Sequence, residues 1–255
     1  MIKKLLICFL LLAGGKAYAN ISVFPYNIDF EAESNKRVQT IRVINTSNET
    51  QTYRVSFVNF SQDENGRLTE ATDFATAANK YLNWSPRQFT LKPNEVQTIN
   101  VARRSMAQAQ DGEYISHLKI SEVALGAPKV KNQNAESDTL SMQLKALFAI
   151  TLPVTISKGN ALHNVTQITD YKLLNSDNLQ VSLKRSGNQS SRVNIAVIND
   201  KGKEIGRVNS VKIYLSTDKL NISVPLDRSL LTHKANLKLE DARAKKDIST
   251  QAISL

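Results

Sequence analysis

Apolar and polar residues alternate with a period of two along most of the chain after residue 20, in short runs separated by polar turn residues. This period predicts β-strands with one buried face. Turn residues recur about every 8–12 positions, a spacing that is typical of a β-sandwich. The chain is therefore predicted to be all-β, with strands at residues 21–30, 38–44, 52–58, 89–91, 96–101, 114–123, 179–183, 193–198 and 210–215.

Three local features refine this pattern. The segments 89–91 and 96–101 flank the turn 92–95, and we expect them to form a hairpin-like pair. Residues 199–202, Asn-Asp-Lys-Gly, have the composition of a hairpin turn. Residues 70–81 are rich in alanine and do not alternate, so they form either a short helix or a long loop over one end of the sandwich.

The longest alternating run covers residues 140–152. Its apolar positions, spaced by two, are Leu140, Met142, Leu144, Ala146, Phe148, Ile150 and Leu152. A strand of this length spans about 40 Å, which exceeds the usual length of a strand. One interpretation is an ordinary core strand. The other is a strand that lends its apolar side chains to another protein, because a long apolar edge is otherwise an aggregation hazard.

The length and punctuation of the chain predict two domains. Pro153 and the segment 156–159 resemble the exit of a first domain, and a second strand-rich series begins at residue 164. We place the boundary at about residues 155–162. The first sandwich domain is then residues 20–157 and the second is residues 158–255, which is near the size of one immunoglobulin-like sandwich.

The first nineteen residues have the pattern of a secretory signal peptide. Lys3 and Lys4 precede an apolar run, and Ala17 and Ala19 supply the small residues of a cleavage site. The run is too short to span a bilayer, and no other apolar stretch suits membrane insertion. Cleavage before Asn20 leaves a chain without cysteine, because Cys8 is the only one, so disulfides do not support the fold.

The charge suggests a class of partner without naming one. The sequence carries a formal net charge of +10, and three of its lysines lie in the predicted signal peptide, which leaves +7. A basic balance is typical of proteins that bind nucleic acid, anionic lipid or an acidic protein. Export argues against nucleic acid. A solvated basic surface explains the same charge.

The residues that carry chemistry do not form a catalytic pattern. The three histidines, His117, His163 and His233, have no partners at metal-ligand spacing. We expect His117 to make a structural hydrogen bond. No nucleophile elbow or phosphate-binding glycine loop is present in the sequence. The chain is therefore predicted to be no enzyme and to need no metal or cofactor.

Four segments, taken in order, resemble a known family. They are WSPRQFTLKP at residues 84–93, QTINVARR at 97–104, DGEYISHL at 111–118 and the alternating run before Pro153. Together they resemble the periplasmic chaperones of the chaperone–usher pathway, which assemble fimbriae, and most closely the archaic branch. The resemblance covers the first domain well. It extends to the second domain only through size and strand content.

The resemblance implies a boomerang of two immunoglobulin-like domains located in the periplasm. Fimbrial subunits of this pathway are incomplete sandwiches, and the chaperone fills their groove with its own strand until an outer-membrane usher receives the complex. In this chain the donor residues would be Leu140, Met142, Leu144, Ala146 and Phe148. The implied partners are fimbrial subunits and the usher.

One departure from the family concerns the anchor for the terminal carboxylate of the subunit. Other branches use a basic pair, with one residue on the first strand and one on the donor strand. Residues 25–27 here offer no basic side chain. Arg103, Arg104 or Lys145 could substitute, and arginine suits a carboxylate because it binds through two donors. Alternatively, the two arginines only end a strand and face water.

A different class of function also fits sandwich domains. The chain could be a structural fimbrial subunit or an adhesin. Such subunits often carry a disulfide and an N-terminal extension that stays unfolded until it is donated. Neither feature is visible, because Ile21 begins a predicted strand almost at once after Asn20.

Overall fold

The computed structural model describes residues 20–72, 74–124, 146–175 and 177–255. The predicted signal peptide, with Cys8, lies outside these residues. The strands of the first domain are β1 (Ile21–Phe24), β2 (Ile28–Glu31), β3 (Val38–Asn45), β4 (Gln51–Gln62), β5 (Leu68–Ala71), β6 (Leu82–Ser85), β7 (Gln88–Leu91), β8 (Val96–Arg103), β9 (Gly112–Glu122) and β10 (Ala149–Lys158).

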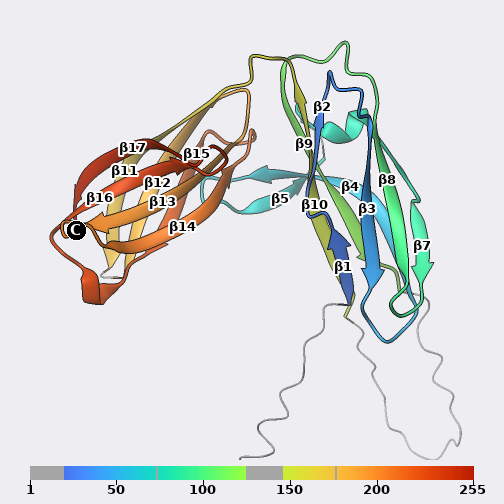
Figure 1. Ribbon diagram of the computed structural model, residues 1–255, viewed down its shortest axis with the longest axis horizontal. Coiled ribbons are helices and arrows are strands. Elements are labelled where there is room, and N and C mark those ends of the chain that lie inside the picture. The colour runs from blue at the N-terminus through green and yellow to red at the C-terminus, as the bar shows by residue number, and fades with distance from the viewer. Residues whose placement is uncertain (1–19, 73, 125–145, 176) are drawn as a thin grey trace, which may run out of the picture.

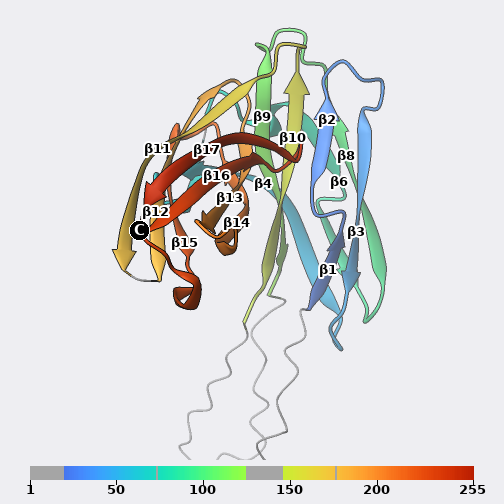
Figure 2. The same ribbon diagram turned by 60° about the vertical axis from the view of Figure 1, so that its left-hand side comes forward.

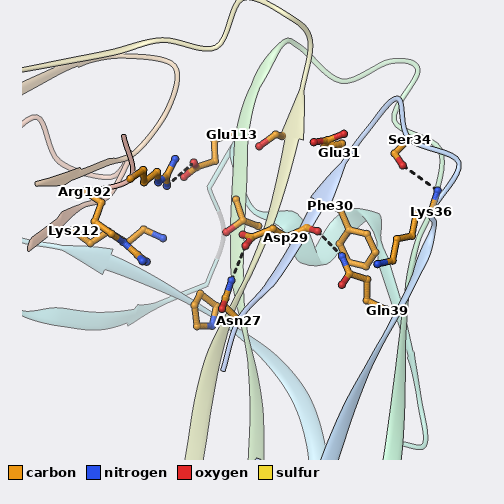
Figure 3. Close-up of a pocket in the computed structure, with 14 residues that line it drawn as sticks. Asn27, Asp29, Phe30, Glu31, Ser34, Lys36, Gln39, Glu113, Arg192 and Lys212 are labelled. Carbon is orange, nitrogen blue, oxygen red and sulfur yellow. Dashed lines mark hydrogen bonds and ion pairs between the residues drawn. The ribbon is translucent and has the colours of Figure 1, made fainter. Parts of the chain in front are cut away.

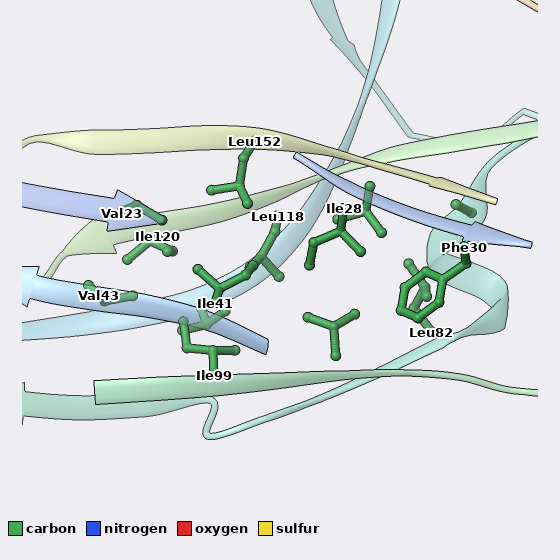
Figure 4. Close-up of a cluster of buried hydrophobic side chains, with 14 of the residues drawn as sticks. Val23, Ile28, Phe30, Ile41, Val43, Leu82, Ile99, Leu118, Ile120 and Leu152 are labelled. Atoms are coloured by element: carbon green, nitrogen blue, oxygen red, sulfur yellow. The ribbon is translucent and has the colours of Figure 1, made fainter. Parts of the chain in front are cut away.

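These strands form two sheets packed face to face (Figure 4). One sheet has the order β1-β3-β8-β6, and the other has the order β2-β10-β9-β4-β5 with β7 paired to β4. The period of two places alternate side chains between the sheets. Ile41 and Ile99 from one sheet and Leu118 and Ile120 from the other are all fully buried. The apolar residues that alternate in the sequence thus form the core of the first domain.

The first strand changes sheets. β1 pairs antiparallel with β3, whereas β2 pairs parallel with β10, and the chain crosses between them at residues 25–27. Figure 2 shows β1 and β2 following one another along the same side of the sandwich. The single predicted strand 21–30 is therefore two short strands.

The predicted hairpin of segments 89–91 and 96–101 is wrong. β7 pairs with β4, while β8 pairs with β3 and β6, so the turn between them crosses from one sheet to the other. Asn45 holds this crossing, because its side-chain amide donates to the backbone oxygen of Leu91 at 3.0 Å and its own backbone oxygen accepts from Asn94 at 2.8 Å. The turn residues reverse the chain without pairing the strands that flank it.

The alanine-rich segment 70–81 is neither a regular helix nor only a loop. Its first residues complete β5, and a 3₁₀ turn, η1 (Ala78–Tyr81), ends it. Ala77 and Ala78 are fully buried, and the backbone N–H of Asn79 donates to Ser116 Oγ at 2.9 Å. The small alanine side chains let this turn pack closely against β9.

The second domain is built from β11 (Asn164–Asn175), β12 (Asn178–Gly187), β13 (Ser191–Asn199), β14 (Glu204–Ile213), β15 (Lys219–Pro225), β16 (Lys234–Asp241) and β17 (Lys246–Ser254), with a 3₁₀ turn, η2 (Arg228–Leu230). One sheet has the order β11-β12-β15 and the other β14-β13-β16-β17. The predicted turn at 199–202 joins β13 to β14, and Gly202 adopts φ 76° there. Leu179, Val181 and Ile195 belong to a second core, separate from the first.

The predicted fold class is therefore confirmed: the chain is all-β and has two β-sandwich domains, set at an angle to one another (Figure 1). The division after residue 157 stays a prediction; β10 ends one residue later, at Lys158. Among the described residues, no helix is long and apolar enough to cross a membrane.

A hairpin of the first domain reaches over to the second. It consists of β4, β5 and their connecting turn, and Figure 1 shows it extending sideways to β14 and β15. The backbone N–H of Asn221 donates to the backbone oxygen of Glu64 at 2.6 Å. The Gln62 side chain donates to Lys212 O at 3.0 Å and accepts from Tyr214 N–H at 2.9 Å. The hairpin thus fixes one domain against the other.

Candidate functional site: the open edge of β10 and the interdomain cleft

One edge of β10 is open along half of the strand. β9 pairs with β10 over its whole length, from Ala149 opposite Ser121 to Lys158 opposite Gly112. On the other edge, β2 pairs only with residues 154–157. Within the described residues, the edge of residues 149–153 therefore has no strand beside it. The backbone N–H and C=O groups of this segment that point away from β9 are available to another extended chain.

The side chains along this strand change from buried to exposed. Leu152 is buried in the core and Ile150 packs against it at the end of the sandwich. Two residues further back, Phe148 is 50% exposed. The inward face of β10 therefore continues beyond the core, carrying apolar side chains that the first domain itself does not cover.

Two of the five predicted donor residues can be placed. Phe148 is half-exposed and Ala146 is exposed, both just before β10 begins. Leu140, Met142 and Leu144 lie outside the described residues, so their role stays a prediction.

Glu122 lies at the point where the open edge begins. It is 6% exposed, its backbone N–H donates to Phe148 O at 2.9 Å, and its Oε2 accepts from Phe148 N–H at 3.4 Å. These two bonds extend the β9–β10 ladder to Phe148. Tyr53 is directly opposite Glu122 on β4; burial, and to a smaller extent this carboxylate, raise the pKa of Tyr53 to about 12.

A cleft of about 510 Å³ lies between the two domains, beside the half of β10 that pairs with β2 (Figure 3). The first domain contributes Asn27 from the crossing before β2, Asp29 from β2 and Thr155 from β10. The second domain contributes three cations, which are Arg192, Lys212 and Arg243.

The acids that line the cleft, Asp29, Glu31 and Glu113, come from the first domain, and all its cations except Lys36 come from the second. Residues 158–255 carry 16 Lys and Arg against 9 Asp and Glu, whereas residues 20–157 carry 14 of each, so the net charge of +7 comes from the second domain. Glu113, which is 1% exposed, lies 3.8 Å from Arg243 Nη2. Burial lowers the pKa of Lys212 to about 8, although Glu113 opposes this shift.

His117 joins the two domains as a neutral side chain. Its ring packs edge-on against Phe60 of β4, and its Nε2 lies 3.3 Å from the hydroxyl of Tyr214 in the second domain. Burial, helped by the charge of Lys212, lowers the pKa of His117 to about 4. The structural hydrogen bond expected from the sequence is confirmed. No group of metal-ligating side chains is present among the described residues.

Neither of the two described carboxylate-anchor candidates, Arg103 and Arg104, lines the cleft. Arg103 is 5% exposed and donates to the backbone oxygens of Arg104 at 3.1 Å and Ser34 at 3.0 Å. Burial lowers the pKa of Arg103. The interpretation that both arginines face water is therefore wrong for Arg103. Arg104 is exposed and donates to the backbone oxygen of Lys80. Lys145 lies outside the described residues.

The charged groups that meet in the cleft could not be recognised from the sequence. Arg192 and Lys212 are directly opposite one another on β13 and β14, and Glu113 and Arg243 are far apart along the chain. A pair of like charges facing one another across strands is unfavourable on its own. Strand register brings Arg192 and Lys212 together, and the packing of the two domains brings Glu113 near Arg243; the pattern of residues along the sequence contains neither.

No family model matches the chain, and no curated protein matches it either. Among solved structures, the YadV chaperone aligns with 93% of this chain and 100% of its own length, at 11% identity and a TM-score of 0.50. The chain has the fold of the fimbrial chaperones. The chaperone of the archaic CsuC–CsuE complex of Acinetobacter baumannii aligns with 92% of this chain and 97% of its own, at 14% identity and a TM-score of 0.49. The class 5 fimbriae chaperone CfaA covers 92% of this chain and 100% of its own, at 14% identity and a TM-score of 0.48.

The resemblance to the fimbrial chaperones, predicted from segments of the first domain, is thus confirmed at the level of the fold. It also extends further than the sequence indicated, because the chaperone fold aligns with both domains. In this fold the open edge of β10 lies on the first domain, beside the angle between the two sandwiches (Figure 1).

Proposed function

We propose that the chain is a periplasmic chaperone that binds and caps fimbrial subunits by donating the strand that leads into β10. The observation that carries this proposal is the open edge of residues 149–153, which continues into the half-exposed Phe148. A protein that leaves such an edge open exposes itself to aggregation, so the edge needs a partner. A subunit that lacks one strand supplies that partner.

Both the backbone and the side chains of this strand would contribute to binding the subunit. The backbone of residues 149–153 would bond to a strand of the subunit, which is β-augmentation. The side chains of Phe148, Ala146, Leu144, Met142 and Leu140 would fill pockets in the subunit. Each large apolar side chain that leaves water contributes about 1.5–3 kcal/mol, less the cost of ordering the segment that carries it.

The remaining elements of the proposal follow from the predicted export and the shared fold. The signal-peptide pattern supports a periplasmic location. CsuC–CsuE is described as a pre-assembly complex of a chaperone with a tip adhesion subunit, which supports a fimbrial subunit as the partner. We further propose that an outer-membrane usher receives the subunit, and that the chain acts without catalysis.

The anchor for the terminal carboxylate of the subunit is proposed at Arg103, Arg104 or Lys145. Arg104 is the more accessible of the two described arginines, whereas Arg103 would have to release two backbone oxygens to bind a carboxylate. Affinity for the subunit should therefore fall in Arg104→Ala. The fall should be larger than the one caused by replacing a surface arginine elsewhere on the chain. Unchanged affinity in both Arg103→Ala and Arg104→Ala would leave Lys145 as the candidate.

The test is co-expression of the full chain with the fimbrial subunits encoded beside its gene, followed by pull-down from periplasmic extract. We expect a soluble one-to-one complex that disappears in Leu144→Asp. The matched control is Gln143→Asp, which puts the same charge on the opposite face and should retain the subunit. If Leu144→Asp keeps the subunit, or if the wild-type chain polymerises with itself as a subunit does, the proposal is wrong.

A further inference from the structure

Two aromatic side chains stand exposed beside the open edge. Phe24, the last residue of β1, is 66% exposed, and Tyr26 is 75% exposed. Their ring centroids are 6.4 Å apart and the rings meet edge to face at 81°. Neither ring belongs to the core of the first domain. Packing within the domain therefore does not explain why two aromatic residues occur here.

The place of this pair follows from strand register. β2 begins at Ile28, which is opposite Val154 of β10. The crossing at residues 25–27 therefore closes one end of the open edge of residues 149–153. A strand that pairs with that edge must end, or turn away, beside Tyr26.

β1 borders the same space from the other sheet. It is the edge strand of the order β1-β3-β8-β6, and it lies beside β10 in both views (Figures 1 and 2). Ile21 and Val23 point into the core, while Phe24 points outward. The aromatic pair is thus continuous with the open edge, and its surroundings are polar: Phe24 is opposite Arg42 on β3, and Asn27 donates to Asp29 at 2.6 Å.

We propose that Phe24 and Tyr26 form an aromatic platform for the subunit at the point where the strand paired with β10 ends. The inference rests on the proposed function and adds a second contact to it. The platform binds an apolar side chain at the end of that subunit strand, and it therefore helps to decide which subunits the chaperone accepts.

The occupant must be an extended chain because the unpaired backbone groups of residues 149–153 can be satisfied together only by a strand. An exposed aromatic pair with a polar surround is typical of the residues that dominate interface affinity, since aromatic rings bury large areas and lose few rotamers. The platform and the open edge would then bind the same subunit strand, so both would contribute to the affinity for the subunit.

The test is a competition inside the periplasm. The fimbrial subunit encoded beside the gene is co-expressed with equal amounts of the wild-type chain and the Phe24→Thr, Tyr26→Thr double variant, each carrying a different tag. The ratio of subunit recovered with each tag reports their relative affinities. We expect the double variant to recover about tenfold less subunit, in line with the loss of an aromatic anchor. Threonine keeps the strand propensity of β1, and circular dichroism checks that the variant is folded.

Two control variants make the result specific. Val96→Thr replaces another exposed apolar residue, which is 42% exposed at the start of β8 and away from the open edge, and should compete equally with wild type. Tyr26→Phe keeps the ring and should also compete within about twofold. If the double variant competes equally while Leu144→Asp loses the subunit, the platform is wrong and the proposed function stands.

The remaining outcomes also decide the matter. Failure of the wild-type chain to retain any subunit refutes the proposed function, and the platform with it. If the double variant competes equally for subunit but changes the self-association of the free chain, the aromatic pair binds a second copy of the chain, and the platform for subunits is wrong.

Discussion

Gln62 should stabilise the contact between the two domains. Its replacement tests whether this contact keeps the domains at a fixed angle. The side chain is 7% exposed and lies at the end of β4, inside the interface with the second domain. Its amide donates to Lys212 O at 3.0 Å and accepts from Tyr214 N–H at 2.9 Å. In Gln62→Ala, the backbone oxygen of Lys212 and the backbone N–H of Tyr214 lose these hydrogen bonds.

The magnitude follows from the burial of these groups. A buried polar group left without a partner costs about 1–3 kcal/mol, and two such groups would cost about 2–4 kcal/mol if water reaches them in part. The bond from Gln62 N–H to Ser216 Oγ at 2.9 Å involves the backbone and can persist. We therefore expect the free energy of unfolding to fall by about 2–4 kcal/mol, with most of the loss in the contact between the domains.

Urea denaturation measures the total loss, and small-angle X-ray scattering measures the angle between the domains. Gln97→Ala is the matched control, because Gln97 is half-buried on β8, away from the second domain, and its side chain donates to the neighbouring Thr98 O. That control should change stability by less than about 0.5 kcal/mol. If Gln62→Ala is as stable as Gln97→Ala and scatters like wild type, the hairpin of β4 and β5 does not fix the domains.

Two further predictions concern buried titratable groups. The pKa of His117 is about 4 in the folded chain and about 6.5 when unfolded, so the unfolded state binds more protons between these values. Stability should fall as pH drops from about 6.5 to 4, by roughly 3 kcal/mol in denaturation at fixed pH, and His117→Asn should flatten this profile; an unchanged profile contradicts the assignment. In Glu122→Gln, the loss of negative charge beside Tyr53 should lower the pKa of that tyrosine from about 12, as measured by ultraviolet titration. A pKa that stays the same or rises would show that burial alone causes the shift.

The sequence predicted the first core well because its signal is local. Ile41 and Val43 of β3, and Ile99 and Val101 of β8, are fully buried at the period of two that the strands require. Edge strands of the second domain carry less of this signal. On β17, Ile253 is the only buried residue, so β17 could not be recognised from alternation.

Pairing and long-range contacts could not be predicted for a different reason. The turn after Leu91 shows that the chain reverses, but the choice of sheet depends on Asn45, which lies far away in the sequence. Likewise, Glu113 lies near Arg243 because the two domains pack against one another, a contact that includes the bond from Glu113 N–H to Asn188 O at 2.9 Å. Both facts depend on tertiary register, and periodicity contains no information about it.

β9 connects the parts of the site, which argues that the open edge is built for a partner. At one end its Glu122 extends the ladder to Phe148, and at the other its Glu113 faces the cations of the cleft. Between them, His117 packs against Phe60 and contacts Tyr214 of the second domain. A strand held at three points presents the edge of β10 in one orientation before any partner arrives. Preorganisation of this kind lowers the entropy lost on binding. An edge left open by accident would have no need of such support, whereas a donor strand gains affinity from it.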